Sequence, residues 1–178
     1  SQGWYEEAER HLTAAWAKDE AISGLRYDLA LLYFKQGQYE KATPLFEAEA
    51  ADDPANVMSR YYAGIGRLNQ KQYEKALVHL NEASEKSPTI RPNGYYYAGI
   101  CHLQLGQYGQ AIEKLQYVRD NADSANLRQN AEKWLTASRS RQISDSRFRW
   151  SLKLGYQYDS NITLEQLDED RPADEEDF

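Results

Sequence analysis

The chain has 178 residues, 41% of them hydrophobic, and a net charge of −7. That length is enough to bury a sizeable core. Residues 165–178 hold eight acids and one arginine, which account for the whole net charge and leave residues 1–164 neutral overall. A neutral body lacks the basic face of a nucleic-acid-binding protein, so we expect no nucleic-acid partner. No apolar run is long enough for a membrane-spanning helix.

The chain repeats itself at a fixed period. Segments 32–42, 68–76 and 103–111 each place a tyrosine three residues before an alanine, and these alanines are Ala42, Ala76 and Ala111. The steps are 34 and 35 residues, and a half copy at 3–8 precedes them. A period of this size indicates a stacked repeat architecture, and the phase implies that the sequence opens in the middle of a repeat.

Apolar residues recur at helical spacing from the N-terminus to about residue 141. We expect helices over 4–18, 23–36, 38–51, 55–70, 72–86, 93–105, 107–120 and 124–141. Pro44 falls near the start of its helix, where proline is least disruptive. The last of these helices has polar outer positions, which is typical of the solubilising cap of a repeat array.

This order of helices, turn glycines and alanines resembles the tetratricopeptide repeat family, whose unit is a 34-residue helix–turn–helix. The resemblance covers about residues 3–125, with full copies at 23–56, 57–90 and 92–125. Among the departures from the family pattern, Arg67 and His102 replace aromatic residues, and Lys71 replaces the turn glycine. The resemblance implies an all-α, right-handed helical solenoid of a half repeat, three full repeats and a capping helix, over residues 1–141.

In that family the first helix of each repeat lines a concave groove. The matching positions here would form a tyrosine ladder with an aliphatic floor. Tyrosine combines a rigid ring with a hydroxyl, which suits extended peptides or sugar rings. The resemblance therefore implies a groove that binds a client, and it would be lined by Tyr27, Leu31, Tyr61, Tyr62, Ile65, Tyr96, Tyr97 and Ile100.

The sequence offers little for other chemistry. Some family members grip a terminal carboxylate with lysine and asparagine, but the matching positions carry Tyr27, Leu31 and Tyr62. The single cysteine, Cys101, excludes an intramolecular disulfide and a multi-cysteine metal site. No nucleophile–base pair or phosphate-binding loop stands out, so we expect no enzyme activity, no cofactor and no metal.

Residues 147–158 break the helical rhythm. Apolar and polar residues alternate there, which predicts a half-buried β-strand followed by an acidic tail. Since one strand is not stable alone, it would pair with a partner, pair with a second copy of the chain, or lie along the helical stack. The strand-pairing residues would be Phe148, Trp150, Leu152, Leu154, Tyr156 and Tyr158.

A repeat array followed by such a strand resembles the junction in bacterial outer-membrane proteins that join a periplasmic repeat domain to a β-barrel. Surface lipoprotein assembly modifiers and some exopolysaccharide exporters have this layout, and alternation of this kind is typical of barrel strands. We therefore expect residues 142–178 to be a linker, a strand and an acidic tail that begin a further domain.

The leading hypothesis is a non-enzymatic scaffold on the periplasmic side of the outer membrane, where it binds a protein or peptide client. One alternative is a soluble, cytoplasmic adaptor that self-associates or pairs through residues 147–158. Another is a carbohydrate-binding module of polysaccharide export, since the tyrosines would also suit sugar rings.

Overall fold

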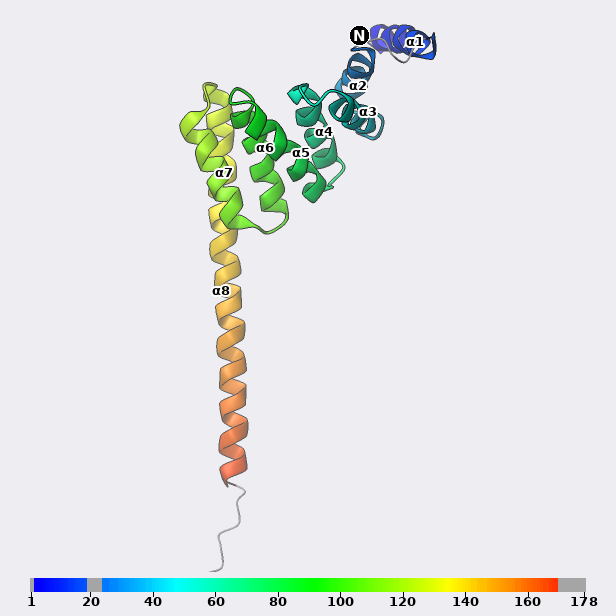
Figure 1. Cartoon of the computed structure of the whole chain (residues 1–178). Coiled ribbons are helices and arrows are strands. Elements are labelled where there is room, and N and C mark those ends of the chain that lie inside the picture. Colours follow the sequence, from blue (N-terminus) through cyan, green and yellow to red (C-terminus); the bar gives the residue numbers. More distant parts are fainter. Residues whose placement is uncertain (1, 19–23, 170–178) are drawn as a thin grey trace, which may run out of the picture. The chain divides into compact units, whose positions relative to one another are not determined.

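The computed structural model describes residues 2–18 and 24–169, and it describes side chains for residues 5–18 and 24–153. Eight helices follow one another in these residues (Figure 1), and the first seven begin and end within two residues of the bounds expected from the sequence. The all-α solenoid is thus confirmed. The helices are α1 (Gln2–Lys18), α2 (Leu25–Lys35), α3 (Tyr39–Asp52), α4 (Val57–Asn69), α5 (Tyr73–Lys86), α6 (Arg91–Gln104), α7 (Tyr108–Asn121) and α8 (Ala125–Glu169).

The chain divides into two compact units, Ser1–Ser138 and Arg139–Phe178. Within the first unit, every helix from α1 to α6 packs against the next one in sequence. The buried residues form three successive clusters instead of one central core: the first joins α2, α3 and α4, the second α4, α5 and α6, and the third α7 and α8. This nearest-neighbour packing is how a repeat array stabilises itself.

One large side chain of the second helix is fully buried in every full repeat. Phe46, Leu80 and Leu115 follow one another at steps of 34 and 35 residues, and all three are fully buried. A Cβ atom added at Gly64 would lie 2.6 Å from Cγ of Leu80, and one added at Gly99 would lie 2.7 Å from Cγ of Leu115. The first helix of each of these repeats must therefore lack a side chain where the leucine of the second helix enters.

The turn inside each repeat requires a left-handed residue. Gly37 and Gly106 have φ angles of 74° and 72°, and Lys71 takes the same place in the second repeat with a φ of 59°. A residue with a Cβ atom is strained in this region, whereas glycine is not. The second repeat therefore contains a turn that is less favourable than its neighbours.

Arginines close the junctions between repeats. The guanidinium of Arg60, in α4, donates to the carbonyl oxygens of Ala50 and Pro54, both at 3.0 Å. Arg91 donates to the carbonyl oxygen of Ser84 at 3.0 Å, and Arg128 donates to that of Ala122 at 2.6 Å. Since the last carbonyls of a helix have no partner within it, each arginine satisfies an acceptor left at the end of the preceding helix.

The β-strand expected over residues 147–158 is wrong in this structure, because these residues continue α8. An isolated strand would leave its backbone groups unpaired, whereas a helix satisfies them within the segment. The strand-pairing roles of Phe148, Trp150 and Leu152 fall with it, and their side chains are instead exposed on the helix. The side chains of Leu154, Tyr156 and Tyr158 lie outside the described residues.

The described part of the second unit is basic, and some of its side chains contact each other along the helix. Asp145 and Arg149 form an ion pair at 2.7 Å, and the ammonium group of Lys153 lies 5.5 Å from the ring centre of Trp150. Among the helices that the structure describes, none combines the length and the apolar content needed to cross a membrane.

We predict opposite stability effects for the same substitution at two lysines. Lys71→Gly relieves the left-handed strain, so it should raise the free energy of unfolding by about 1 kcal/mol. Lys133→Gly places glycine in an exposed, regular part of α8, so it should lower that free energy by about 1 kcal/mol. Urea unfolding followed by circular dichroism checks both, and equal destabilisation by the two substitutions would contradict the strained turn.

Candidate binding surface

Five tyrosines on the first helices of the three full repeats form a continuous run of ring contacts. Tyr27 lies on α2, Tyr61 and Tyr62 on α4, and Tyr96 and Tyr97 on α6. The ring centres are 6.4 Å apart for Tyr27 and Tyr62, 5.4 Å for Tyr61 and Tyr62, 6.1 Å for Tyr61 and Tyr97, and 5.2 Å for Tyr96 and Tyr97. All five are half-buried, and we call them the tyrosine ladder.

The α2 end of the ladder also packs into the core. Tyr62 lies 5.0 Å from Phe34 and 5.2 Å from Phe46, and Tyr27 lies 5.7 Å from Phe46, all between ring centres. These rings hold their tyrosine neighbours in fixed positions. A rigid aromatic surface loses little conformational entropy when a ligand covers it.

The three aliphatic residues expected beneath the ladder differ in burial. Ile65 is buried in the cluster that joins α4, α5 and α6. Leu31 is half-buried and packs against the first cluster, and Ile100 is half-buried on α6. Leu31 and Ile100 therefore retain some exposed surface, whereas Ile65 belongs to the interior.

Three hydroxyls of the ladder have a raised pKa. Burial, followed by the neighbouring Tyr97 and Tyr62, raises the pKa of Tyr61 far above its ordinary value of 10.0. Burial is also the largest cause of the raised pKa of Tyr27 and of Tyr97. All three hydroxyls therefore stay protonated at neutral and moderately alkaline pH and can donate hydrogen bonds.

A sixth ring joins the ladder from α8. The indole nitrogen of Trp134 donates a hydrogen bond to the hydroxyl oxygen of Tyr96 at 3.1 Å. Both rings pack against the buried cluster of α7 and α8. The sequence analysis did not place Trp134 at the binding surface. Its place could have been found by extending the repeat phase one helix further.

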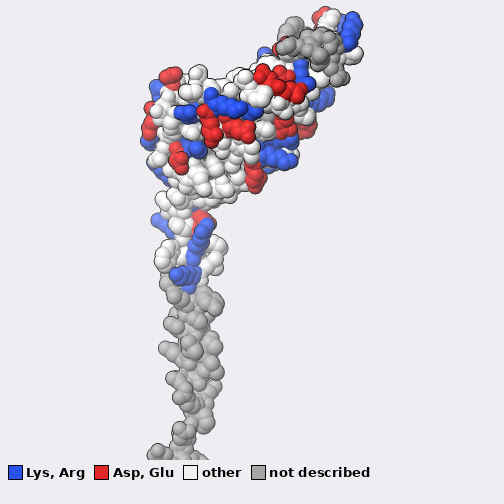
Figure 2. Space-filling model, viewed as in Figure 1, with Lys and Arg blue, Asp and Glu red and all other residues white. Residues whose placement is uncertain are grey.

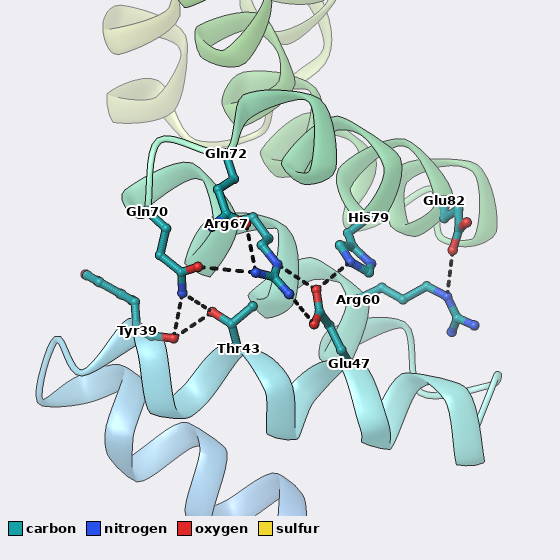
Figure 3. A network of polar contacts seen from close by, with 9 residues as sticks. All are labelled: Tyr39, Thr43, Glu47, Arg60, Arg67, Gln70, Gln72, His79 and Glu82. Atoms are coloured by element: carbon teal, nitrogen blue, oxygen red, sulfur yellow. Dashed lines mark hydrogen bonds and ion pairs between the residues drawn. The ribbon is translucent and has the colours of Figure 1, made fainter.

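A polar network lies between α3, α4 and α5 (Figure 3). Arg67 grips Glu47 in a bidentate pair, with N–O distances of 2.7 Å and 2.5 Å, and His79 contacts the same carboxylate at 3.0 Å. Arg67 also donates to the side-chain oxygen of Gln72 at 2.8 Å. Arg67 stands where the family pattern has an aromatic residue, so the departure noted in the sequence is what creates this network.

The network extends to the start of α3 through Gln70. Its side-chain nitrogen donates to the backbone oxygen of Tyr39 at 2.9 Å and to the hydroxyl of Thr43 at 3.0 Å. A Cβ atom at Gly66 would lie 2.2 Å from that hydroxyl oxygen. The glycine lets α4 approach α3 closely enough for these bonds to form.

Contacts within the network change the pKa of Glu47 and of Arg67. Burial raises the pKa of Glu47, but hydrogen bonds and charge interactions with Arg67 and His79 outweigh burial and hold the pKa below its ordinary value of 4.5. The hydrogen bond to Glu47 is likewise the main reason that the pKa of Arg67 is raised. Glu47 is therefore ionised in the folded protein at neutral pH.

The remaining polar features are separate from the ladder. Among the described residues, no group of three or more histidine, cysteine or acidic side chains could hold a metal ion. Cys101 is fully buried, and burial is the main cause that raises its thiol pKa to about 12. A pocket of about 390 Å³ is lined by two acids, two glutamines and a tyrosine, none of them in the ladder: Tyr5, Glu6, Glu9, Gln36 and Gln38.

Charges of both signs are interspersed on the face of the first unit that Figure 2 shows. Several of them form ion pairs across neighbouring helices, such as Arg60 with Glu82 at 3.0 Å and Arg26 with Asp52.

Two sequence-family models match the chain, and both are described as tetratricopeptide repeat. One matches residues 1–68 and the other matches residues 94–124, so together they match more than half of the chain. No curated protein sequence matches it.

Solved structures of similar fold include MamA, with 16% identity and a TM-score of 0.61 over 82% of this chain and 93% of that one. The Yersinia enterocolitica type III secretion chaperone SycD, in complex with a peptide of the translocator YopD, has 22% identity and a TM-score of 0.61 over 66% and 92%. PcrH, in complex with the chaperone-binding region of PopD, has 23% identity and a TM-score of 0.63 over 70% and 96%. At these identities the likeness shows the fold alone.

We predict that Glu47 makes stability depend on pH. A carboxylate whose pKa is lowered by folding stabilises the native state above its unfolded pKa, and this stabilisation is lost as the pH falls through the folded pKa. Glu47→Gln should therefore lower the free energy of unfolding by about 1–2 kcal/mol near pH 7 and by much less near pH 3.

Thermal unfolding at several pH values measures the difference between the two proteins. Glu82→Gln is the matched control, since Glu82 pairs with Arg60 but has an exposed side chain. A constant difference for Glu47→Gln across the pH range would contradict the role given to its charge.

Proposed function

Because the chain belongs to the tetratricopeptide repeat family, we propose that it is a non-enzymatic scaffold that binds an extended client segment along the tyrosine ladder. The observation that carries this proposal is the continuity of the ladder over α2, α4 and α6, since every ring contacts the next. A packing role alone does not require tyrosine at these positions, because phenylalanine would fill the same space. The hydroxyls add donors and acceptors where the rings are half-exposed.

An extended peptide is the ligand that fits such a surface best. It presents a carbonyl oxygen at every residue and side chains at regular intervals, and a run of about twelve residues can cross several adjacent helices. Similar solved structures support this class of partner, since SycD and PcrH hold a peptide or a binding region of another protein. A sugar chain is the second candidate, because tyrosine rings also stack on sugar rings.

We predict that the double variant Tyr61→Ala with Tyr96→Ala loses client binding. The probe is a set of peptides about twelve residues long, selected on the purified full chain from a displayed random library. Loss of two aromatic anchors should weaken their binding roughly 10- to 100-fold, because such anchors dominate the energetics of interfaces. Isothermal titration calorimetry measures the affinities.

The matched control is Tyr73→Ala with Tyr108→Ala. These tyrosines are also half-buried and 35 residues apart, but they lie on the second helices α5 and α7. Circular dichroism verifies that both double variants fold. If the ladder variant binds the selected peptides as well as the control does, the groove proposal is wrong. Binding of cellohexaose or maltohexaose that the ladder variant loses, with no peptide selected, would favour the sugar-binding function instead.

The proposal extends to a place in the cell, the periplasmic side of a bacterial outer membrane. It rests on the resemblance of the repeat array to the periplasmic repeat domains of outer-membrane assembly and export proteins. A scaffold there would hold client segments during assembly or export.

Cell fractionation tests this placement. In cells that make the natural full-length protein, we expect it in the outer-membrane fraction, with the tetratricopeptide repeats accessible to protease only after the outer membrane is permeabilised. Recovery in the cytoplasmic fraction would overturn the placement and leave the client-binding proposal standing.

A further inference from the structure

The tyrosine ladder does not end with the last repeat. Trp134 lies on α8, outside the three full repeats, yet its indole donates to Tyr96 at 3.1 Å. It belongs to the same compact unit as the ladder, and its ring is half-buried. A residue needed only to cap the stack could be aliphatic, as Leu135 beside it is. The hydrogen bond instead links the indole to a hydroxyl at the α6 end of the ladder.

Burial is the largest cause of the raised pKa of the two central tyrosines Tyr61 and Tyr97. The groups that shift Tyr61 are Tyr97 and Tyr62, and those that shift Tyr97 are tyrosines too. Of the three ladder tyrosines whose pKa is raised, only Tyr27 has a charged side chain, Asp28, among the causes. A charged ligand residue above α4 or α6 would therefore lose water without gaining a partner of opposite sign.

Tyrosine rings can also attract cations, as two pairs elsewhere in this chain illustrate. The ammonium group of Lys41 lies 4.9 Å from the ring centre of Tyr33, and that of Lys114 lies 4.0 Å from that of Tyr95. Within the ladder, however, the rings meet at interplanar angles of 59° to 75°. In this arrangement the edge of one ring covers part of the face of the next, and it is the face that would attract a cation.

We infer that Trp134 extends the proposed binding site onto α8, and that the resulting six-ring surface selects client segments whose central residues carry no charge. This inference rests on the proposed client-binding function and names the class of segment that the site accepts. Apolar side chains would cover the rings, and backbone carbonyls of the segment would accept hydrogen bonds from the tyrosine hydroxyls.

The first test uses Trp134→Phe, which keeps an aromatic ring but removes the indole donor and part of the surface. The same selected peptides should bind this variant about five- to tenfold more weakly than the wild type, a change of about 1–1.4 kcal/mol. Trp150→Phe is the matched control, since Trp150 is 64% exposed on α8 in the second unit. Unchanged affinity in Trp134→Phe would overturn the extension onto α8.

The second test measures directly whether a bound peptide contacts Trp134. In a variant with Trp4, Trp16 and Trp150 changed to Phe, Trp134 is the sole tryptophan, because the chain has four. Binding of a selected peptide should shift its emission to shorter wavelength. Emission that stays constant at saturating peptide would contradict contact with Trp134.

The third test concerns charge. The selected peptides should lack charged residues at their centres, and a single Asp or Lys placed there should weaken binding at least tenfold. Selection of peptides with charged central residues would contradict the inference that the site accepts uncharged segments. Failure of the inference is distinguishable from failure of the proposed function, because in the latter case the Tyr61→Ala and Tyr96→Ala double variant also keeps full affinity.

Discussion

The entry of one large side chain per repeat into a gap on the facing helix governs the rest of this structure. Leu80 and Leu115 occupy space that only Gly64 and Gly99 leave open, with the hypothetical Cβ atoms 2.6 Å and 2.7 Å from the leucine Cγ atoms. Because the contact recurs after 35 residues in the second and third full repeats, it fixes the rotation of their first helices about their axes. Tyr61 and Tyr96 each lie three residues before one of these glycines, so the same contact aligns the ladder.

Most of the solenoid could be predicted because the information is local and repeated. Each helix contacts mainly its neighbours in sequence, so the period of the turns and alanines determined seven helices to within two residues. The register of the tyrosines followed from the same period. The period does not predict which residue pairs with a side chain that departs from the repeat pattern. Arg67 was visible as an exception, but its bond to Glu47 depends on a residue 20 positions away that no pattern marks.

The segment after the solenoid could not be predicted for a different reason. Alternation of apolar and polar residues indicates a strand only if a neighbouring strand pairs with it. In α8 the backbone bonds are internal to the helix, so the side chains of residues 147–153 impose no constraint by packing. Phe148, Trp150 and Leu152 are all about 60% exposed, and such a pattern fits either backbone geometry equally well. Burial of one face normally decides whether an apolar pattern has the period of 2 of a strand or the period of 3.6 of a helix. These side chains are exposed, so that evidence is missing here.

The distribution of charge links the fold to the proposed function. Several ionised side chains of the first unit are engaged between helices: Arg67 with Glu47, Arg60 with Glu82, and three arginines with the carbonyls that end α3, α5 and α7. These pairs hold the second helices against the first ones without placing a charge among the central rings of the ladder. The half-buried tyrosines that remain on the first helices pack well enough to stay rigid and are exposed enough to contact a ligand. A surface of this kind discriminates by the cost of desolvating charge, and affinity would come from apolar contact and hydroxyl hydrogen bonds rather than from electrostatic steering.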